Sequence, residues 1–255
     1  MEEETSTSSA CALQADAFRK LYPTTYLSRF LSEGIRPDGR PLGCARATTI
    51  GRRALSTVDG SSLVKVGSTT ALAGVKLELG RPSEATPDQG SITFNVEAAP
   101  FSAADYRPGR PPEYISAISE RLHSILLGCG VLQLQQLSVA SSKHCWNATV
   151  DVYVLDADGA VFDVVLLAVV AALLDVLVPG VTISKEGQAH RSAAGEKADT
   201  SESRLQLGAV PVSLTCCLYQ DQVLADPTAE EEAVSAGLLT TVIDKAGRLY
   251  GAFRV

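Results

Sequence analysis

Apolar and polar side chains alternate along residues 146–154 and then give way to an apolar run. The alternating apolar positions are Trp146, Ala148, Val150, Val152 and Val154. A period of two with β-branched residues is typical of a strand with one buried face. Residues 156–159, Asp-Ala-Asp-Gly, then supply a turn. Residues 161–177 are apolar nearly all round, which predicts a helix buried on most sides and ended by Pro179-Gly180.

This apolar run does not predict a membrane span. It is uninterrupted only from Val164 to Leu174, far short of the ~20 residues that a spanning helix needs. Asp163 and Asp175 bracket it. We therefore expect the helix to lie in a protein core and the protein to have no membrane partner.

Other periodic segments predict the elements that cover this core. Residues 61–66 and 69–79 predict a hairpin turned at Gly67-Ser68, and residues 91–97 alternate as a further strand. A helix that starts near Pro111-Pro112 carries one apolar face made by Ile115, Ile118, Leu122, Ile125 and Leu126. Four more strands are expected at 210–218, 222–224, 238–244 and 248–253.

The N-terminal part and one internal segment follow different patterns. Residues 1–10 are acidic and Ser/Thr-rich and predict a disordered tail. Helical spacing over 18–31 is broken by Pro23, after which Thr24 or Thr25 can cap a helix that Gly34 ends. The turn Arg36-Pro37-Asp38-Gly39-Arg40 follows. Residues 184–208 are polar and aperiodic, and we expect a long mobile loop there.

The order of strands, hairpin and helix recurs along the chain. This order predicts an α+β fold with mixed β-sheets covered by helices, in two pseudo-repeated strand–hairpin–helix halves. Residues 11–255 then form one domain after the acidic tail.

The composition and net charge of the chain argue against several classes of function and site. The 255 residues carry a net charge of −7, which argues against a stand-alone nucleic-acid binder. The six cysteines form no CxxC and the three histidines are scattered, so we expect no metal site, no cofactor and mostly buried free thiols. The chain starts with Met-Glu-Glu-Glu, unlike a signal peptide, which predicts an intracellular protein.

Four segments together resemble the RNase PH family. They are RPDGR at 36–40, GSSLVKVGSTTALAGVKLE at 60–78, WNATVDVYVLDADGAVFD at 146–163 and LADPTAEEEAVSAGLLTTVID at 224–244. Within the family this combination resembles the ring subunits of the eukaryotic RNA exosome. The resemblance runs from about Tyr22 to Val255, and it implies the RNase PH-like fold.

The resemblance also implies where the chemistry of active members would lie. They degrade RNA by phosphorolysis, with an anion pocket at the start of the helix after the DADG-type turn and an aspartate as general acid. Here residues 160–163, Ala-Val-Phe-Asp, offer neither hydroxyl nor cation, and Asp163 is expected to cap the helix and repel phosphate. The position of the general acid falls on Gly237.

The remaining charged positions divide into two groups. The acidic run of Asp226, Glu230, Glu231 and Glu232 is interpreted as a solvated acidic face. The resemblance implies RNA contacts for Arg107 and Arg110, just before the helix that starts near residue 111. Within this helix, Arg121 lies one residue out of step with the family's arginines. The family also continues past the last strand into a C-terminal helix, which is expected to be missing here.

The resemblance implies a non-catalytic structural subunit of the exosome ring, which helps to form the channel for RNA. Its partners would be other RNase PH-like subunits, cap subunits with RNA-binding domains and the RNA in the channel, in nucleus, nucleolus and cytoplasm. Two alternatives stay open. One is an active phosphate-dependent 3′–5′ exoribonuclease, and the other is an RNA-free scaffold that binds only proteins.

Overall fold

The strand predicted around Trp146 lies inside the larger of the main sheets. The computed structural model describes residues 14–102, 113–140, 143–183, 189–191 and 203–254. Six strands form this sheet in the order β1-β2-β3-β6-β4, with β5 also paired to β6. They are β1 (Thr48–Arg52), β2 (Gly60–Val66), β3 (Thr69–Gly80), β4 (Ser91–Ala98), β5 (Ser138–Ala140) and β6 (His144–Asp156). Because β4 runs parallel to β6 and the other pairs are antiparallel, the sheet is mixed, as predicted.

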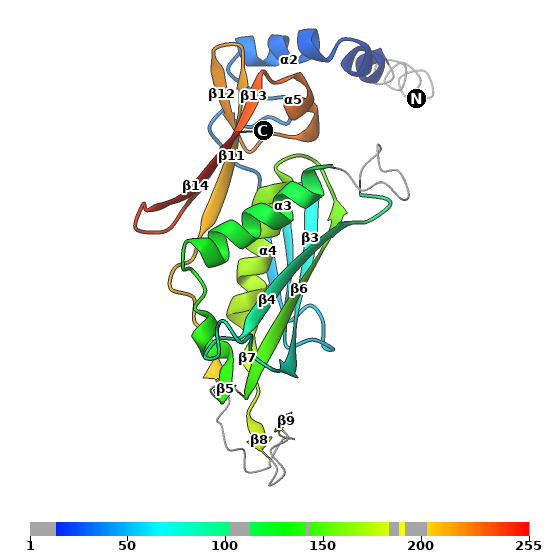
Figure 1. Cartoon of the computed structure of the whole chain (residues 1–255). Helices are drawn as coiled ribbons and strands as arrows, with labels where there is room; N and C mark the ends of the chain where they lie inside the picture. The colour runs from blue at the N-terminus through cyan, green and yellow to red at the C-terminus, as the bar shows by residue number, and fades with distance from the viewer. Residues whose placement is uncertain (1–13, 103–112, 141–142, 184–188, 192–202, 255) are drawn as a thin grey trace, which may run out of the picture.

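Two helices cover one face of this sheet (Figure 1). They are α4 (Val161–Asp175) and α3 (Glu113–His123), and α3 continues into one π-helical turn (Ser124–Gly128). A 3-10 turn (Leu134–Leu137) precedes β5. The alternating apolar positions of β6 are all buried, and so are the five apolar positions that predicted α3. These expectations are confirmed.

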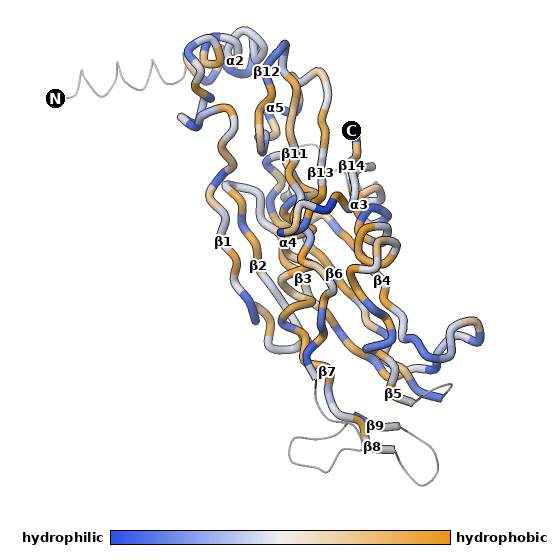
Figure 2. Tube along the Cα trace, turned by 90° about the vertical axis from the view of Figure 1, so that its left-hand side faces the viewer, coloured by the Kyte–Doolittle hydropathy of each residue, from blue (hydrophilic) through white to orange (hydrophobic). Residues whose placement is uncertain are grey.

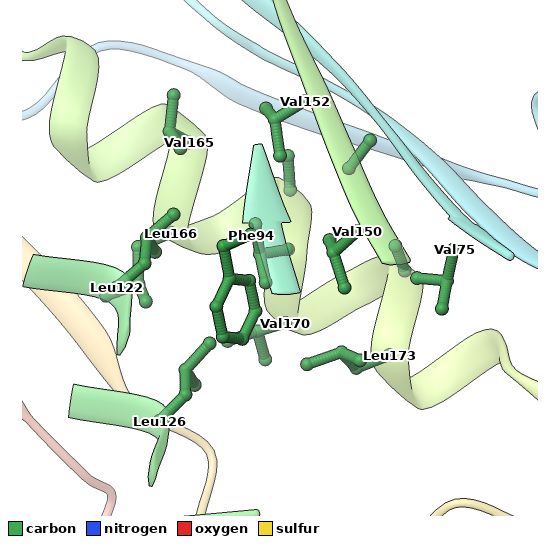
Figure 3. Close-up of a cluster of buried hydrophobic side chains, with 14 of the residues drawn as sticks. Val75, Phe94, Leu122, Leu126, Val150, Val152, Val165, Leu166, Val170 and Leu173 are labelled. Carbon is green, nitrogen blue, oxygen red and sulfur yellow. The ribbon is translucent and has the colours of Figure 1, made fainter. Parts of the chain in front are cut away.

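The interior between the helices and the sheet is apolar (Figure 3). Strand side chains such as Phe94 and Val150 meet Leu122 of α3 and Leu166 of α4, and all four are buried. Each such side chain stabilises the fold by about 1.5–3 kcal/mol through its removal from water. The periodic residues of the sequence thus form one continuous core.

The end of α4 differs from the prediction. The helix stops at Asp175, Val176 is extended, and Leu177–Val178 form the short strand β7, which pairs with β10 (Ser203–Arg204). Pro179-Gly180 therefore follow a strand. An apolar strand of two residues has no period of its own, and it cannot be distinguished in sequence from one more helical turn.

The second main sheet is antiparallel and has the order β12-β11-β13-β14. Its strands are β11 (Val212–Tyr219), β12 (Gln222–Ala225), β13 (Gly237–Ile243) and β14 (Leu249–Arg254). The four predicted strands are confirmed. The short helix α5 (Ala229–Val234), which was not predicted, lies near α2 (Pro23–Ser32) at one end of this sheet (Figure 1). A second cluster of buried residues forms there: Leu27, Leu31, Cys217, Tyr219 and Leu224.

Two details correct the expected N-terminal part. The helix α2 starts at Pro23 itself, after Tyr22, and no side chain caps it, so neither Thr24 nor Thr25 has the predicted role. Proline suits the first helical position because the amide it lacks has no partner there in any helix. Gly34, with φ +71°, follows the end of α2 as expected.

The segment expected to be a loop contains short strands in its described part. β8 (Val181–Ile183) pairs with β9 (Ala189–Arg191), and Leu205 after β10 is buried against the main core. The predicted tail at residues 1–10 lies outside the described residues. Within the described ranges, no helix is long and apolar enough to cross a membrane.

Candidate functional site

A cavity of about 500 Å³ lies where α3, the start of α4, α5 and β13 meet. We call it the α4 cleft. Its walls are mostly apolar and carry few charges. The lining residues that matter below are Tyr114, Arg121, Ala160, Val161, Phe162, Glu232, Leu238 and Thr240. The start of α4, where the resemblance places the anion pocket, therefore borders a real cavity.

The start of α4 is held by a carboxylate from another helix. Ala160 follows Gly159 in left-handed conformation, with φ +48°, and its N–H donates to Oε1 of Glu232 at 2.8 Å. The left-handed turn aims this amide into the cleft. A carboxylate is favourable beside the positive end of a helix dipole. Glu232 of α5 thus occupies the position at which an anion would approach.

Asp163 does not have the predicted role as the cap. Its Oδ2 accepts the backbone N–H of Thr215 in β11 at 2.7 Å, and no side-chain cap bond is made at Ala160, the N-cap of α4. A carboxylate at the third helical position can accept the N–H of the N-cap residue, as Glu231 does for Thr228 in α5, but the N–H of Ala160 donates to Glu232 and not to Asp163. The carboxylate instead connects α4 to the second sheet.

Burial governs the protonation of both carboxyl groups. Burial raises the pKa of Glu232, and the charge of Asp163 adds to this, while the Ala160 N–H and the charge of Arg46 oppose it. Burial also raises the pKa of Asp163, and the hydrogen bond from Thr215 opposes the effect. The two groups therefore favour protonation more than ordinary surface carboxylates do.

Among the described residues that line the cleft, the cation is Arg121. Its guanidinium carbon lies 5.1 Å from the ring centroid of Phe253 in β14, a cation–π distance. Arg107 and Arg110 lie outside the described residues, so their contact with RNA stays a prediction. No three His, Cys, Asp or Glu side chains of the described ranges are grouped to hold a metal ion.

The position that the resemblance assigns to the general acid, Gly237, lies beside the cleft at the start of a strand. Gly237 begins β13, but Leu238 and Thr240 are the residues of this strand that line the cleft. Successive side chains of a strand point to opposite faces. A side chain at 237 would therefore point away from the cleft, and the strand position that reaches it is occupied by Leu238.

The acidic run after β12 is not a solvated face, because two of its carboxylates, Asp226 and Glu231, are buried in ion pairs. Arg36, with no exposed surface, donates from Nε to Oε1 of Glu231 at 2.9 Å and from Nη2 to Oε2. The same guanidinium donates to the carbonyl oxygens of Ala225 and Asp226. The N–H donors of the buried guanidinium therefore have acceptors on all sides, which is the condition for burying a charge.

Arg46 makes a second buried pair. Its Nε and Nη2 donate to the two carboxylate oxygens of Asp226 at 3.0 and 2.8 Å, and its backbone N–H donates to Oδ2 at 2.7 Å. Its remaining donors reach the carbonyl oxygens of Asp158 and Gly159, in the turn before α4. Burial would raise the pKa of Asp226, but the bonds and charge of Arg46 outweigh it and lower the pKa.

These two ion pairs connect segments that are far apart in the sequence. We call Arg36, Arg46, Asp226 and Glu231 the junction cluster. It ties the RPDGR turn and the turn before α4 to the second sheet and α5. Glu230 alone of the run keeps the expected exposure, in a surface pair with Arg19. No local pattern could reveal the cluster, because the partners are 195 and 180 residues apart.

Comparisons with known proteins identify the family. Residues 45–179 match the "3' exoribonuclease family, domain 1" and residues 209–251 its domain 2. The chain is similar to the exosome complex component rrp43 of Schizosaccharomyces pombe, with 31% identity over 229 residues that cover 90% of this chain and 83% of that protein. It is 34% identical over 226 residues to the exosome complex component Rrp42 of Aeropyrum pernix, covering 89% of this chain and 80% of the relative.

The fold agrees with the sequence match. A chain in the solved structure of the Archaeoglobus fulgidus exosome with RNA bound to the active site has a TM-score of 0.77 and 28% identity. The similarity covers 95% of this chain and 88% of that one. The predicted RNase PH-like fold is confirmed, and the chain belongs to the RNase PH family of 3′ exoribonucleases.

Proposed function

We propose that this chain is a non-catalytic structural subunit of an RNA exosome ring and helps to form the channel through which RNA reaches a nuclease elsewhere. The relatives named above are exosome components, and the similar solved chain comes from an exosome that holds RNA. Its neighbours would be other RNase PH-like subunits and RNA-binding cap subunits. Work in nucleus, nucleolus and cytoplasm is part of the same proposal.

The observation that carries the lack of catalysis is Glu232 at the start of α4. Phosphorolysis needs inorganic phosphate beside free amides and cations. Here a carboxylate accepts the hydrogen bond of the Ala160 amide, and a second carboxylate, Asp163, lies in the first turn of the same helix. Like charges repel phosphate from this position.

An active phosphorolytic exoribonuclease is the second candidate, and one observation favours it. The α4 cleft contains both a guanidinium, Arg121, and a carboxyl group whose pKa is raised by burial, Glu232. A buried carboxyl with a raised pKa is the kind of group that serves as a general acid. The two candidates therefore assign opposite roles to Glu232: an internal anion that blocks phosphate, or an acid that helps cleavage.

Incubation of the purified chain with 3′-labelled RNA and inorganic phosphate separates them. We expect no nucleoside diphosphate to be released. Release that disappears in both Glu232→Gln and Arg121→Ala would contradict the proposal and establish the enzyme. The matched control is Arg29→Ala, because Arg29 is a guanidinium near an aromatic ring, Phe18, in the N-terminal part, away from the α4 cleft.

The part played by RNA requires a separate measurement. Ultraviolet crosslinking of labelled RNA to the assembled complex, followed by mapping of the modified peptides, should mark the peptide that contains Arg107 and Arg110. Absence of any crosslink to this chain, in a complex whose other chains are crosslinked, would favour the RNA-free scaffold.

A further inference from the structure

The first strand of the six-stranded sheet, β1, has one free edge. Every residue of β1 is exposed, and the strand stands at the end of the sheet, paired with β2 on one side. Figure 2 shows β1 at the rim of the molecule, with no other labelled element of the described chain on its outer side. The backbone groups along this edge therefore decide what the strand can bind.

The hydrogen bonds to β2 determine which residues of β1 face outward. At the two ends of this ladder, the N–H of Gly67 donates to the carbonyl oxygen of Ala47 at 3.0 Å, and the N–H of Arg53 donates to that of Ser61 at 2.9 Å. In an antiparallel pair, the residues bonded to the partner strand recur at every second position. The odd-numbered positions are thus bonded to β2. The N–H and C=O groups that point away from the sheet belong to Thr48, Ile50 and Arg52.

Two other edge strands are contacted from within the chain. In β4, the carbonyl oxygen of Phe94 accepts the hydroxyl of Ser119 in α3 at 2.9 Å. In β12, the N–H of Ala225 donates to the carbonyl oxygen of Leu42 at 3.0 Å. No hydrogen bond from the described residues reaches the three outward-facing residues of β1. Such an unpaired edge is a template for another strand.

Ile50 adds an apolar contact to this edge. It is opposite Val64, which has no exposed surface and belongs to the core beneath α4. Directly opposite residues project from the same face of a sheet, so Ile50 projects on the side that the helices cover. Its side chain is nevertheless 47% exposed, because β1 lies at the margin of that layer. A strand added beside β1 would cover Ile50 and extend the layer.

The edge is basic, although the chain as a whole carries a net charge of −7. Arg52 and Lys65 are exposed, and neither has an ion-pair partner in the described part of the chain. Arg53 adjoins them and pairs with Asp175 at 3.5 Å. Cations at a sheet edge deter pairing with a like-charged strand. A second copy that paired through β1 would bring these cations together, so a strand that carries carboxylates is favoured.

We propose that β1 accepts an edge strand of a neighbouring RNase PH-like subunit, so that one sheet continues across the contact between the two subunits. The inference rests on the proposed function for the identity of the neighbour. The outward main-chain groups supply the hydrogen bonds, Ile50 supplies an apolar contact, and Arg52 with Lys65 selects acidic side chains. The five residues of β1 offer ~17 Å for this pairing.

Amide hydrogen exchange, resolved to single residues, tests this contact. The full chain is measured alone at low concentration and assembled with RNase PH-like partner subunits in the absence of RNA. β1 contains its own control, because successive amides point to opposite sides. The odd-numbered amides from 49 to 53 bond to β2 and should be protected in both states. The even-numbered amides from 48 to 52 should exchange fast in the isolated chain and slow by at least ~10-fold in the complex.

A matched pair of variants separates the backbone from the side chain. Ile50→Pro and Ile50→Ala both lose the isoleucine side chain, but only proline lacks the N–H, which makes no bond within the described chain. Proline is tolerated at such edge positions. We expect similar urea unfolding of the two variants, and incorporation of Ile50→Pro into the complex that is at least ~10-fold lower. If Ile50→Pro does not fold, Thr48→Pro, at the first residue of the strand, replaces it.

Four results would overturn the inference, and they have different meanings. Even-numbered amides that stay fast in a formed complex, or normal incorporation of the proline variant, refute the edge contact and leave the proposed function intact. Even-numbered amides that are already slow in the isolated chain mean that this chain covers its own edge. Protection that appears only after RNA is added makes the edge an RNA contact. A wild-type chain that forms no complex with RNase PH-like subunits refutes the proposed function and, with it, this inference.

Discussion

Two interiors hold this molecule together, and they are built in opposite ways. Around α4, a large cluster of buried apolar side chains from β2, β3, β4, β6 and α3 fills the space (Figure 3). At the junction cluster, two guanidinium groups and two carboxylates are buried at the boundary between the sheets. Apolar packing contacts have no preferred direction, so the interior around α4 tolerates many side-chain combinations. In the junction cluster, each buried charge needs its own partner. The same fold thus uses packing within the larger sheet and paired charges to attach the second sheet.

The sharpest test of this comparison is Arg36→Ala. Removal of one partner leaves Glu231 buried and charged without a counterion, so the free energy of unfolding should fall by about 3–5 kcal/mol. Urea-induced unfolding measures it. Arg19→Ala, in an exposed pair with Glu230, is the matched control and should cost less than about 1 kcal/mol. Equal effects of the two variants would mean that the junction cluster contributes no more than a surface pair.

The apolar interior is tested by Leu166→Ala. Leu166 is fully buried between α4 and its neighbours, so truncation leaves a cavity and should cost roughly 2–4 kcal/mol in urea unfolding. Leu174 near the end of α4 is partly exposed and serves as the control, since Leu174→Ala opens no closed cavity. A Leu166→Ala variant as stable as Leu174→Ala would show that the α4 interior is loosely packed.

Acidification should weaken the junction cluster before the apolar interior. The pKa of Asp226 is lower in the folded chain, so its stabilising contribution is present above its unfolded pKa of about 3.9 and is lost as pH falls through the folded pKa. Below pH ~4 the wild-type free energy of unfolding should therefore decrease through this group. Asp226→Asn should lack this component. An identical acid dependence in both chains would exclude Asp226 as its source.

Glu232 should show the opposite sign and the smallest effect. Its pKa is raised in the folded chain, so its contribution is present below the unfolded pKa of about 4.3 and is lost as pH rises through the folded pKa. Glu232→Gln keeps an acceptor for the Ala160 N–H but does not titrate. Relative to wild type, this variant should therefore gain stability as the pH rises from about 4 to 7. A constant difference over this range would contradict the assignment.

The difference between the apolar interior and the junction cluster also explains which features could be predicted from the sequence. β6 and the hairpin of β2 and β3 were predicted because their alternating apolar residues mark the buried face. α4 was predicted because its residues are apolar nearly all round. The junction cluster could not be predicted, because Glu231 in an acidic run looks solvated until Arg36, 195 residues away, is placed beside it. α5 has only six residues and no period to read. In the α4 cleft, the family motif located the helix start, but the roles of Asp163 and Glu232 depended on which side chain the fold brings to Ala160.

We propose above that this chain supports an exosome ring without taking part in its chemistry. The most direct test is phosphorolysis of 3′-labelled RNA by the assembled complex, with either wild-type chain or the double variant Arg121→Ala and Glu232→Gln. We predict equal rates of nucleoside diphosphate release at equal complex concentration, because the reaction takes place elsewhere in the ring. A rate that falls by roughly 10²-fold or more, the usual loss when a general acid is removed, would contradict the claim and place an active site in this chain.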